Sequence, residues 1–226
     1  MAEARKSATQ IAPRIMPEKP QLIFDDPSSA DQTIALAHGA GAGMNTPFMN
    51  AFAHGLASHG LRVARFEFPY MATYRTTRQR KPPDREPVLR ETWLKVIDQL
   101  GRDRLIIGGK SMGGRIASLV ADEAKVARLV CLGYPFHPTG KPHVLRVEHL
   151  KTIVTPTLIC QGTRDPFGNR EEVMRYPLSR AITVHWLEDG DHSFKPRKKS
   201  GRTERQSWDE AIGAIADFII ARAHSG

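Results

Sequence analysis

Ser111 lies in the stretch of this sequence whose residue types and spacing best suit covalent chemistry. Residues 105–115 read LIIGGKSMGGR: an apolar run typical of a strand stops at glycines, presents a serine and continues into residues with helical spacing. A serine at the tip of a sharp strand-to-helix turn needs glycine two residues to each side, because neighbouring chains approach it closely. The free N–H groups at the start of the helix, that of Met112 first, could stabilise an oxyanion. The pattern predicts a nucleophilic serine, although a glycine-rich turn can also cradle a phosphate or simply pack tightly.

A nucleophilic serine needs two partners, and the sequence offers candidates for both. A neutral imidazole must accept the hydroxyl proton, and a buried carboxylate must orient that imidazole. His192 is the candidate base because it follows the last predicted strand, residues 182–187. Asp165 is the candidate acid because it follows the strand before that one, residues 157–160. Serine, acid and histidine therefore come in the chain order that a nucleophile on a strand-to-helix turn requires.

Two other aspartates compete for the role of the acid. Asp189 and Asp191 both lie near His192 in the sequence. Asp191 is its immediate neighbour, which makes a hydrogen bond to Nδ1 awkward, so Asp165 is preferred. An aspartate before a proline, as at Asp165, can also be only a turn former.

A second glycine-rich turn, residues 38–43 with the sequence HGAGAG, follows the buried strand predicted for residues 33–37. Its glycines let the backbone turn tightly, so its N–H groups can point into a shared cavity and supply the other half of an oxyanion hole. A dinucleotide site is less favoured, because the Gly-x-Gly-x-x-Gly spacing with a downstream acidic residue is not matched. We expect His38, at the start of this turn, and His185, within a strand, to be structural.

Strands and helices alternate along the chain, which predicts an α/β fold with a mostly parallel sheet and helices on both faces. Ligands of such sheets bind beyond the carboxyl ends of the strands, where all the motifs above fall. Residues 21–226 are expected to form a single domain, and residues 1–20, with three prolines and scattered charge, a flexible lead-in. Besides the strands named above and the one before Ser111, strands are predicted at 21–25, 61–68 and 126–132, and helices at 47–59, 88–100, about 145–150 and about 207–223.

Taken together, the segments HGAGAG at 38–43, GKSMG at 109–113, GTRD at 162–165 and DH at 191–192 resemble those of small, lidless α/β-hydrolases similar to dienelactone-hydrolase-like proteins. They look closest to a group of predicted hydrolases whose animal relatives include a testis-expressed protein and a subunit of a histone-acetyltransferase complex. The resemblance runs from about residue 20 to the C-terminus. It implies an α/β-hydrolase fold without a large lid, a Ser-His-Asp triad and an oxyanion hole built from the N–H groups of Ala40 and Met112. Dienelactone hydrolases carry a cysteine nucleophile, whereas this chain has Ser111.

The positive charge of the chain has several interpretations. The net charge is +9 with histidines neutral, and the pI is about 9.8. Residues 69–87 show no helical or strand period and are predicted as a long loop. We place its Arg78, Arg80 and Lys81 at the rim of the substrate site, where they would attract an anionic substrate. Alternatively, the basic loops are merely solvated or bind an acidic partner, of which nucleic acid is the less favoured kind.

The composition also bears on location and cofactors. No apolar run approaches the roughly 20 residues of a membrane helix, and residues 1–20 hold no apolar signal core, so a cytoplasmic location without a membrane partner is expected. Cys131 and Cys160 lie within apolar runs and are predicted as buried thiols rather than a disulfide framework or a metal site. No cofactor and no metal are expected.

Two hypotheses from different classes follow. In the first, the chain is a serine hydrolase, esterase-like, that cleaves a small-molecule carboxylic ester or related acyl bond through an acyl-enzyme intermediate. In the second, it is a catalytically idle hydrolase-fold scaffold that binds an acidic partner through its basic loops. The full set of triad and oxyanion candidates favours the first, because a scaffold has no need to retain them. The acyl group, the leaving group and the oligomeric state do not follow from the sequence.

Overall fold

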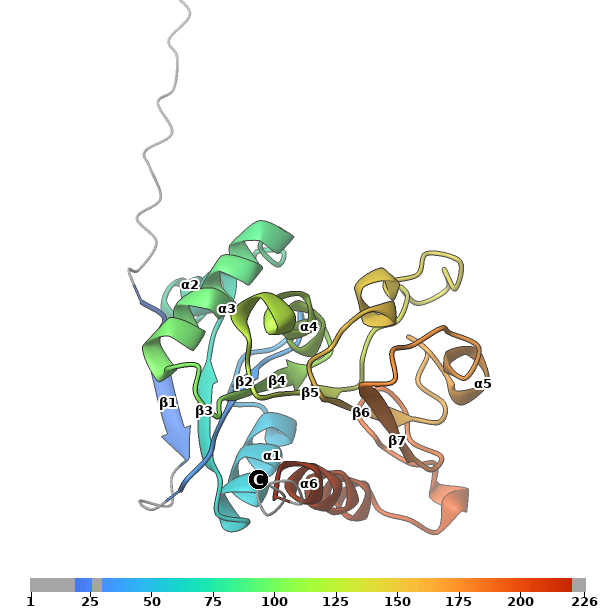
Figure 1. Cartoon of the computed structure of the whole chain (residues 1–226). Helices are drawn as coiled ribbons and strands as arrows, with labels where there is room; N and C mark the ends of the chain where they lie inside the picture. Colours follow the sequence, from blue (N-terminus) through green and yellow to red (C-terminus); the bar gives the residue numbers. More distant parts are fainter. Residues whose placement is uncertain (1–18, 26–29, 221–226) are drawn as a thin grey trace, which may run out of the picture.

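The computed structural model describes residues 19–25 and 30–220, so nearly all of the predicted lead-in, residues 1–20, lies outside the described residues (Figure 1). The strands are β1 Leu22–Asp25, β2 Thr33–Ala37, β3 Arg62–Phe66, β4 Ile106–Lys110, β5 Arg128–Leu132, β6 Thr157–Gly162 and β7 Ile182–Leu187. The helices are α1 Pro47–Ser58, α2 Pro69–Thr77, α3 Glu86–Leu100, α4 Met112–Ala124, α5 Arg170–Val173 and α6 Glu204–Ile220, with short 3-10 turns η1 Glu148–Lys151 and η2 Lys198–Ser200.

These strands form one seven-stranded sheet in the described part of the chain, in the order β1-β3-β2-β4-β5-β6-β7. The edge strand β1 pairs antiparallel with β3, and every other pairing is parallel. The strand β4 lies between β2 and β5, near the middle of the sheet. The turn that follows β4 therefore emerges between the turns that follow its two neighbours.

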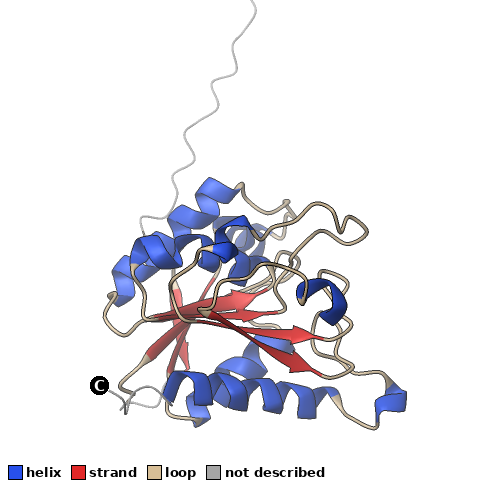
Figure 2. Ribbon diagram, turned by 45° about the vertical axis from the view of Figure 1, so that its right-hand side comes forward, coloured by secondary structure: helices blue, strands red, loops and turns tan. Residues whose placement is uncertain are grey.

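Helices cover both faces of the sheet, which explains why the central strands are apolar on both sides (Figure 2). Helices α1 and α6 pack on one face, where Phe52 and Leu56 share a buried cluster with Ile212 and Ile215. Helices α3 and α4 lie on the other face, where the fully buried Trp93 belongs to the second cluster. Parallel strands joined through helices on both faces give the mostly parallel α/β architecture that the sequence predicts.

Residues 69–77 correct the prediction of a loop over residues 69–87, because Pro69–Thr77 forms α2. Tyr70 and Met71 are buried beneath this helix. The hydroxyl groups of Thr73 and Thr77 donate to carbonyl groups one turn earlier, at 2.8 and 2.7 Å. No helical period is visible here because threonine and arginine occupy most of the remaining positions. The loop itself is limited to residues 78–85.

Other elements differ from the predictions mainly at their ends. Helix α3 begins at Glu86, two residues earlier than predicted, because Pro87 fits within a first helical turn. Helix α6 begins at Glu204 rather than near residue 207, and the end predicted for it lies outside the described residues. The helix predicted at 145–150 is the short 3-10 turn η1. None of the described helices combines the length and the apolar character needed to cross a lipid bilayer.

Candidate active site

Ser111 occupies the sharp turn between β4 and α4, with a φ of 51° and a ψ of −115°. A residue other than glycine pays a conformational cost for a positive φ, so the surrounding structure must hold it there. Its N–H donates to the carbonyl oxygen of Leu132 at 2.9 Å. A Cβ on Gly109 would lie 2.3 Å from the carbonyl oxygen of Ala37, and one on Gly113 would lie 2.6 Å from the same atom. The two glycines are therefore required by the closeness of β2, as the spacing predicts.

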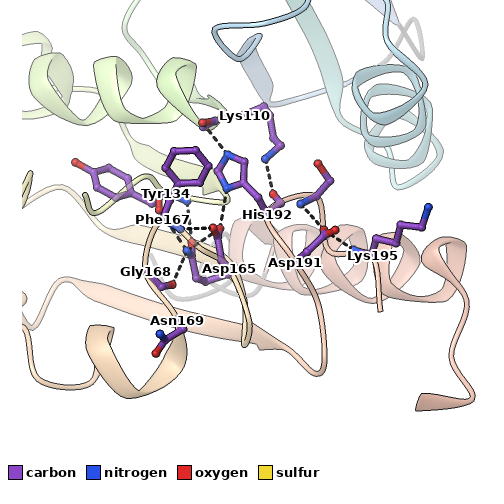
Figure 3. Close-up of polar contacts among 12 residues, drawn as sticks. Lys110, Tyr134, Asp165, Phe167, Gly168, Asn169, Asp191, His192 and Lys195 are labelled. Atoms are coloured by element: carbon purple, nitrogen blue, oxygen red, sulfur yellow. Dashed lines mark hydrogen bonds and ion pairs between the residues drawn. The ribbon is translucent and has the colours of Figure 1, made fainter. Parts of the chain in front are cut away.

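His192 joins Ser111 to Asp165 by two hydrogen bonds (Figure 3). Its Nε2 lies 2.9 Å from Ser111 Oγ, and its Nδ1 lies 2.8 Å from Asp165 Oδ2. Because a carboxylate only accepts hydrogen bonds, the arrangement assigns the ring proton to Nδ1. Nε2 is then free to accept the serine proton, so the three side chains predicted from the sequence come together in a hydrogen-bonded row.

The carboxylate of Asp165 is fully buried and held by further donors. Gln161 Nε2 donates to Oδ2 at 2.9 Å, and the backbone N–H of Phe167 donates to Oδ1 at 2.8 Å. The same Gln161 amide group donates to the carbonyl oxygen of Gly168 at 3.0 Å. A buried carboxylate with every neighbour a donor is fixed in one orientation, which in turn fixes the imidazole of His192.

The two competing aspartates have other partners. Asp189 Oδ2 accepts from the backbone N–H of Arg197 at 2.7 Å, and its Oδ1 pairs with the Arg197 and Arg164 guanidinium groups. The hydrogen bonds from Arg197 hold the pKa of Asp189 at about 2. Asp191 Oδ1 accepts from the backbone N–H groups of Ser193 and Lys195. Neither carboxylate is in contact with the imidazole of His192.

The loop that carries His192 is fixed from two sides. Gly162, at the end of β6, allows the loop to lie directly against it, since a Cβ there would approach the carbonyl oxygens of Gly190 and Asp191 to 2.4 and 2.3 Å. Lys110 Nζ donates to the carbonyl oxygen of His192 at 2.5 Å (Figure 3). Burial lowers the pKa of Lys110 to about 8, while Asp165 and Asp191 act in the opposite direction. Lys110 therefore connects the turn of the serine to the loop of the histidine.

The two predicted oxyanion donors lie beside the serine. Met112 N–H is at the first position of α4, and Ala40 N–H lies in the turn after β2. Within the described chain, neither group donates a backbone or side-chain hydrogen bond. Ala40, Ser111 and Met112 all line one cavity.

Buried polar groups fix the orientation of the Ala40 N–H. The carbonyl of Gly39 belongs to the same peptide unit, and it accepts from His38 Nδ1 at 2.7 Å and from the Tyr70 hydroxyl at 3.3 Å. His38 Nε2 accepts from the N–H of Phe68 at 3.1 Å, which settles its tautomer. Burial lowers the pKa of His38 to about 4. His38 is thus structural, as predicted, and it holds the carbonyl so that the N–H on the other side of the peptide points away from it.

Two cavities meet at Ser111, and the residues Ala40, Ser111 and Phe167 line both. We call the first, of about 340 Å³, the arginine cavity; its other lining residues are Asp84, Glu86, Leu89, Met112, Arg115, Ile116, Pro135 and Arg146. We call the second, of about 410 Å³, the glycine cavity; its other lining residues are Gly39, Gly41, Ala42, Gly43, Thr46, Phe48, Met49, Lys110, His192 and Ser193.

The residues predicted for the substrate rim do not line these two cavities. Arg78 ends α2 and lines a third cavity with Tyr74 and Glu67, and this cavity shares Gly43 and Thr46 with the glycine cavity. The guanidinium of Arg80 lies 6.0 Å from the centre of the Tyr74 ring. Of the loop of residues 78–85, Asp84 lines the arginine cavity, and no residue of the loop lines the glycine cavity.

Cys131 and Cys160 are free and buried, as predicted. They lie on neighbouring strands but in different clusters, on opposite faces of the sheet. Burial raises the pKa of both thiols, which keeps them protonated. His185 contacts Glu210 Oε1 at 3.2 Å, which fits its predicted structural role. In the described part of the chain, no three His, Cys, Asp or Glu side chains gather as a metal site would require.

Four residues of this site were not singled out in the sequence: Lys110, Gln161, Phe167 and Arg146. Lys110, Gln161 and Phe167 stand within four residues of Ser111 or Asp165, so their position at a strand end was the available signal. Arg146 lies in a segment without a helical or strand period, and nothing in the sequence connects it to Ser111.

The sheet order and the serine on the sharp turn after its central strand together define an α/β-hydrolase fold. Residues 30–220 match the family described as alpha/beta hydrolase domain. The chain belongs to that family. Comparison with curated protein sequences gives no match.

Solved structures of low sequence identity share this fold. An alpha-beta serine hydrolase homologue from Coxiella burnetii superposes with a TM-score of 0.64 at 18% identity, over 92% of this chain and 98% of that one. A serine hydrolase without a lid from Xanthomonas campestris gives 0.61 at 17% identity, over 88% and 96%. Alpha/beta hydrolase domain-containing protein 10 from mouse gives 0.65 at 16% identity, over 90% and 96%. These likenesses support the fold.

Proposed function

We propose that the chain is a serine hydrolase that cleaves a carboxylic ester of a small molecule. The observation that carries the proposal is the row of hydrogen bonds from Ser111 through His192 to Asp165, beside two unpaired N–H groups. Fold alone would not support it, because the same fold hosts many functions. The proposal rests on this local geometry.

Each step of the reaction has a residue to perform it. Ser111 Oγ attacks the ester carbonyl carbon while His192 Nε2 takes its proton, and the N–H groups of Ala40 and Met112 stabilise the resulting oxyanion. The imidazolium then gives its proton to the leaving alkoxide as the C–O bond breaks, which leaves an acyl group on Ser111. A water molecule, activated by His192, adds to this acyl group and frees the carboxylic acid and the serine.

The scaffold alternative predicts the same fold without chemistry. It receives no support from the site, since a binding surface does not require a strained serine or an aligned imidazole. The narrower resemblance to dienelactone-hydrolase-like proteins and to the group with chromatin relatives remains a proposal, as do a cytoplasmic location and a single domain over residues 21–226.

The first prediction tests the nucleophile. A fluorophosphonate probe should label the wild-type protein, and Ser111→Ala should abolish labelling and lower ester turnover by at least about 10³-fold, because only binding and the oxyanion donors remain. Ser58→Ala is the matched control, since Ser58 Oγ only bonds the carbonyl of Gly55 at the end of α1. Equal labelling of the wild type and Ser111→Ala would contradict the proposed function.

A further inference from the structure

The arginine cavity contains two guanidinium groups and two carboxylates, but the carboxylates already have partners. Glu86 Oε2 accepts from Arg115 Nη2 at 2.7 Å. Asp84 Oδ2 accepts from the backbone N–H of Tyr70 at 2.8 Å, at the start of α2. Neither carboxylate is paired with Arg146, the fourth charged residue that lines the cavity.

Arg146 has a fixed backbone and a half-buried side chain. Its N–H donates to the carbonyl oxygen of Phe136 at 2.7 Å, and its carbonyl oxygen accepts from the Tyr134 hydroxyl at 2.9 Å. Within the described chain, its guanidinium group makes no hydrogen bond and no ion pair. The Nε of Arg115 in the same cavity is buried and also lacks a hydrogen-bond partner. The half-buried guanidinium group of Arg146 thus lines the cavity without an ion pair to the described chain.

The two guanidinium groups lie near each other in this cavity, which Asp84 and Glu86 also line. Burial, and then the neighbouring guanidinium of Arg115, lower the pKa of Arg146. An arginine keeps its proton despite such a shift, so two like charges remain close together. A bound anion would offset their repulsion and accept the free N–H groups, and a planar carboxylate matches the guanidinium donors in a bidentate arrangement.

The position of His192 decides which part of an ester enters which cavity. The imidazole must pass its proton to the leaving oxygen, so the alcohol has to lie on the side of Nε2. His192 lines the glycine cavity and does not line the arginine cavity. The alcohol therefore occupies the glycine cavity, and the acyl chain extends from Ser111 into the arginine cavity.

We infer that the arginine cavity is an acyl site selective for a short acyl chain that ends in an anionic group, with Arg146 as the residue that recognises the anion. The substrate class is then a monoester of a short dicarboxylic acid with an uncharged alcohol. Water is consumed, the ester C–O bond breaks, and the dicarboxylate and the alcohol are released. The inference rests on the proposed function and narrows its substrate.

The test compares two ethyl esters of equal chain length, monoethyl adipate and ethyl hexanoate, by the ethanol that each releases. The wild type should prefer the monoanionic ester in kcat/KM. Arg146→Gln should lower this preference by about 10- to 100-fold, the range expected for one hydrogen-bonded charge pair. Arg146→Lys keeps the charge but lacks the planar guanidinium group. Its preference for the monoanionic ester should lie between those of the wild type and Arg146→Gln.

A second pair of esters separates the two cavities. Propyl acetate and 3-acetoxypropionate share an acetyl group and differ by an anion on the alcohol side, which the glycine cavity would hold. Arg146→Gln should leave the ratio between these two esters within about threefold, because 10- to 100-fold changes are expected only where Arg146 contacts the anion. A large change in this ratio would place the alcohol, not the acyl chain, beside Arg146 and overturn the assignment.

The control variant is Arg102→Gln, which removes the same charge from an exposed pair with Asp98. It should keep the wild-type preference. Protection of Ser111 from the fluorophosphonate probe by monoethyl adipate, but not by ethyl hexanoate, gives a second readout that does not depend on turnover. Probe labelling and hydrolysis of the neutral ester with an unchanged preference in Arg146→Gln would overturn the inference and leave the proposed function standing. Absence of both labelling and turnover in the wild-type protein would contradict the inference and the proposed function together.

Discussion

Two donors, the Gln161 amide and the Phe167 N–H, hold the carboxylate of Asp165 in position for its hydrogen bond with His192. Asp165→Asn should lower kcat/KM by up to about 10⁴-fold, because an amide at this position favours the wrong imidazole tautomer. The measurement is the rate of ester turnover together with the rate of fluorophosphonate labelling. Thermal unfolding of the same variant checks that the fold is retained.

Asp189→Asn is the matched control for this substitution. Asp189 pairs with Arg197 and Arg164 rather than with His192, so turnover should change by no more than a few-fold. Loss of the Asp189 carboxylate should instead lower the free energy of unfolding, because its hydrogen bonds with Arg197 are lost. If Asp165→Asn left ester turnover unchanged and Asp189→Asn abolished it, the role of the acid would belong to Asp189.

Single residues differ in how far the sequence reveals them. Ser111, Asp165 and His192 could be predicted because each follows a strand, and parallel strands bring their carboxyl ends to one edge. Of the three candidate aspartates, the preferred Asp165 is the one whose carboxylate accepts a hydrogen bond from His192, which the sequence alone could not show. Arg146 could not be found, because its approach to Ser111 depends on the path of a loop that has no periodic pattern.

Among the elements, the turn after β2 depends on the protonation state of His38. The pKa of His38 is lowered from 6.5 to about 4 in the folded protein, so the unfolded chain binds a proton first as the pH falls. The contribution of His38 to the free energy of unfolding is therefore complete above about pH 6.5. It falls by about 3 kcal/mol as the pH decreases toward 4. Urea unfolding at several pH values between 4 and 7 measures the effect.

His38→Asn keeps a donor for the carbonyl of Gly39 but cannot be protonated, so it isolates this contribution. The variant should start less stable at pH 7 and lose less stability on acidification. Some acid sensitivity should persist, because burial also lowers the pKa of His149 to about 4. An identical loss of stability in His38→Asn and the wild type would show that His38 does not take up the proton.

Elements with strong patterns were predicted and weak ones were not. The apolar strands and the amphipathic helices α1 and α6 follow from periodicity, since each buries one continuous face. Helix α2 was missed because its stability comes from two buried side chains, from threonine hydroxyls and from Asp84, which accepts the N–H of Tyr70 from fourteen residues away. Such tertiary contacts leave no period in the sequence.

For the molecule as a whole, the net charge of +9 predicts attraction of anionic substrates over a distance. Raising salt from about 20 to 500 mM should lower kcat/KM for an anionic ester and leave a neutral ester almost unchanged, because screening shortens from about 20 Å to about 4 Å. If Arg78, Arg80 and Lys81 form the predicted rim, their joint replacement by alanine should flatten this salt dependence.

The salt experiment also separates the rim from the arginine cavity. Direct pairing of a buried anion with Arg146 is screened much less than attraction across solvent. The preference in kcat/KM for the ester with the anionic acyl chain should therefore persist at 500 mM salt. Parallel salt curves for anionic and neutral esters, in the wild type and in the triple variant alike, would leave the rim without a role in substrate capture. Nucleic acid or another acidic partner would then be the better explanation of the positive charge.

The contact from Lys110 Nζ to the carbonyl of His192 restricts a second position of the chain. The lysine stands between Gly109 and Ser111 and connects the turn of the serine to the loop of the histidine. A Cβ on Gly133 would come within 3.0 Å of the same ammonium group and 2.7 Å of the same carbonyl. A side chain at position 133 would therefore have to displace both the ammonium group of Lys110 and the backbone of the loop that carries His192, and it would have to adopt a positive φ.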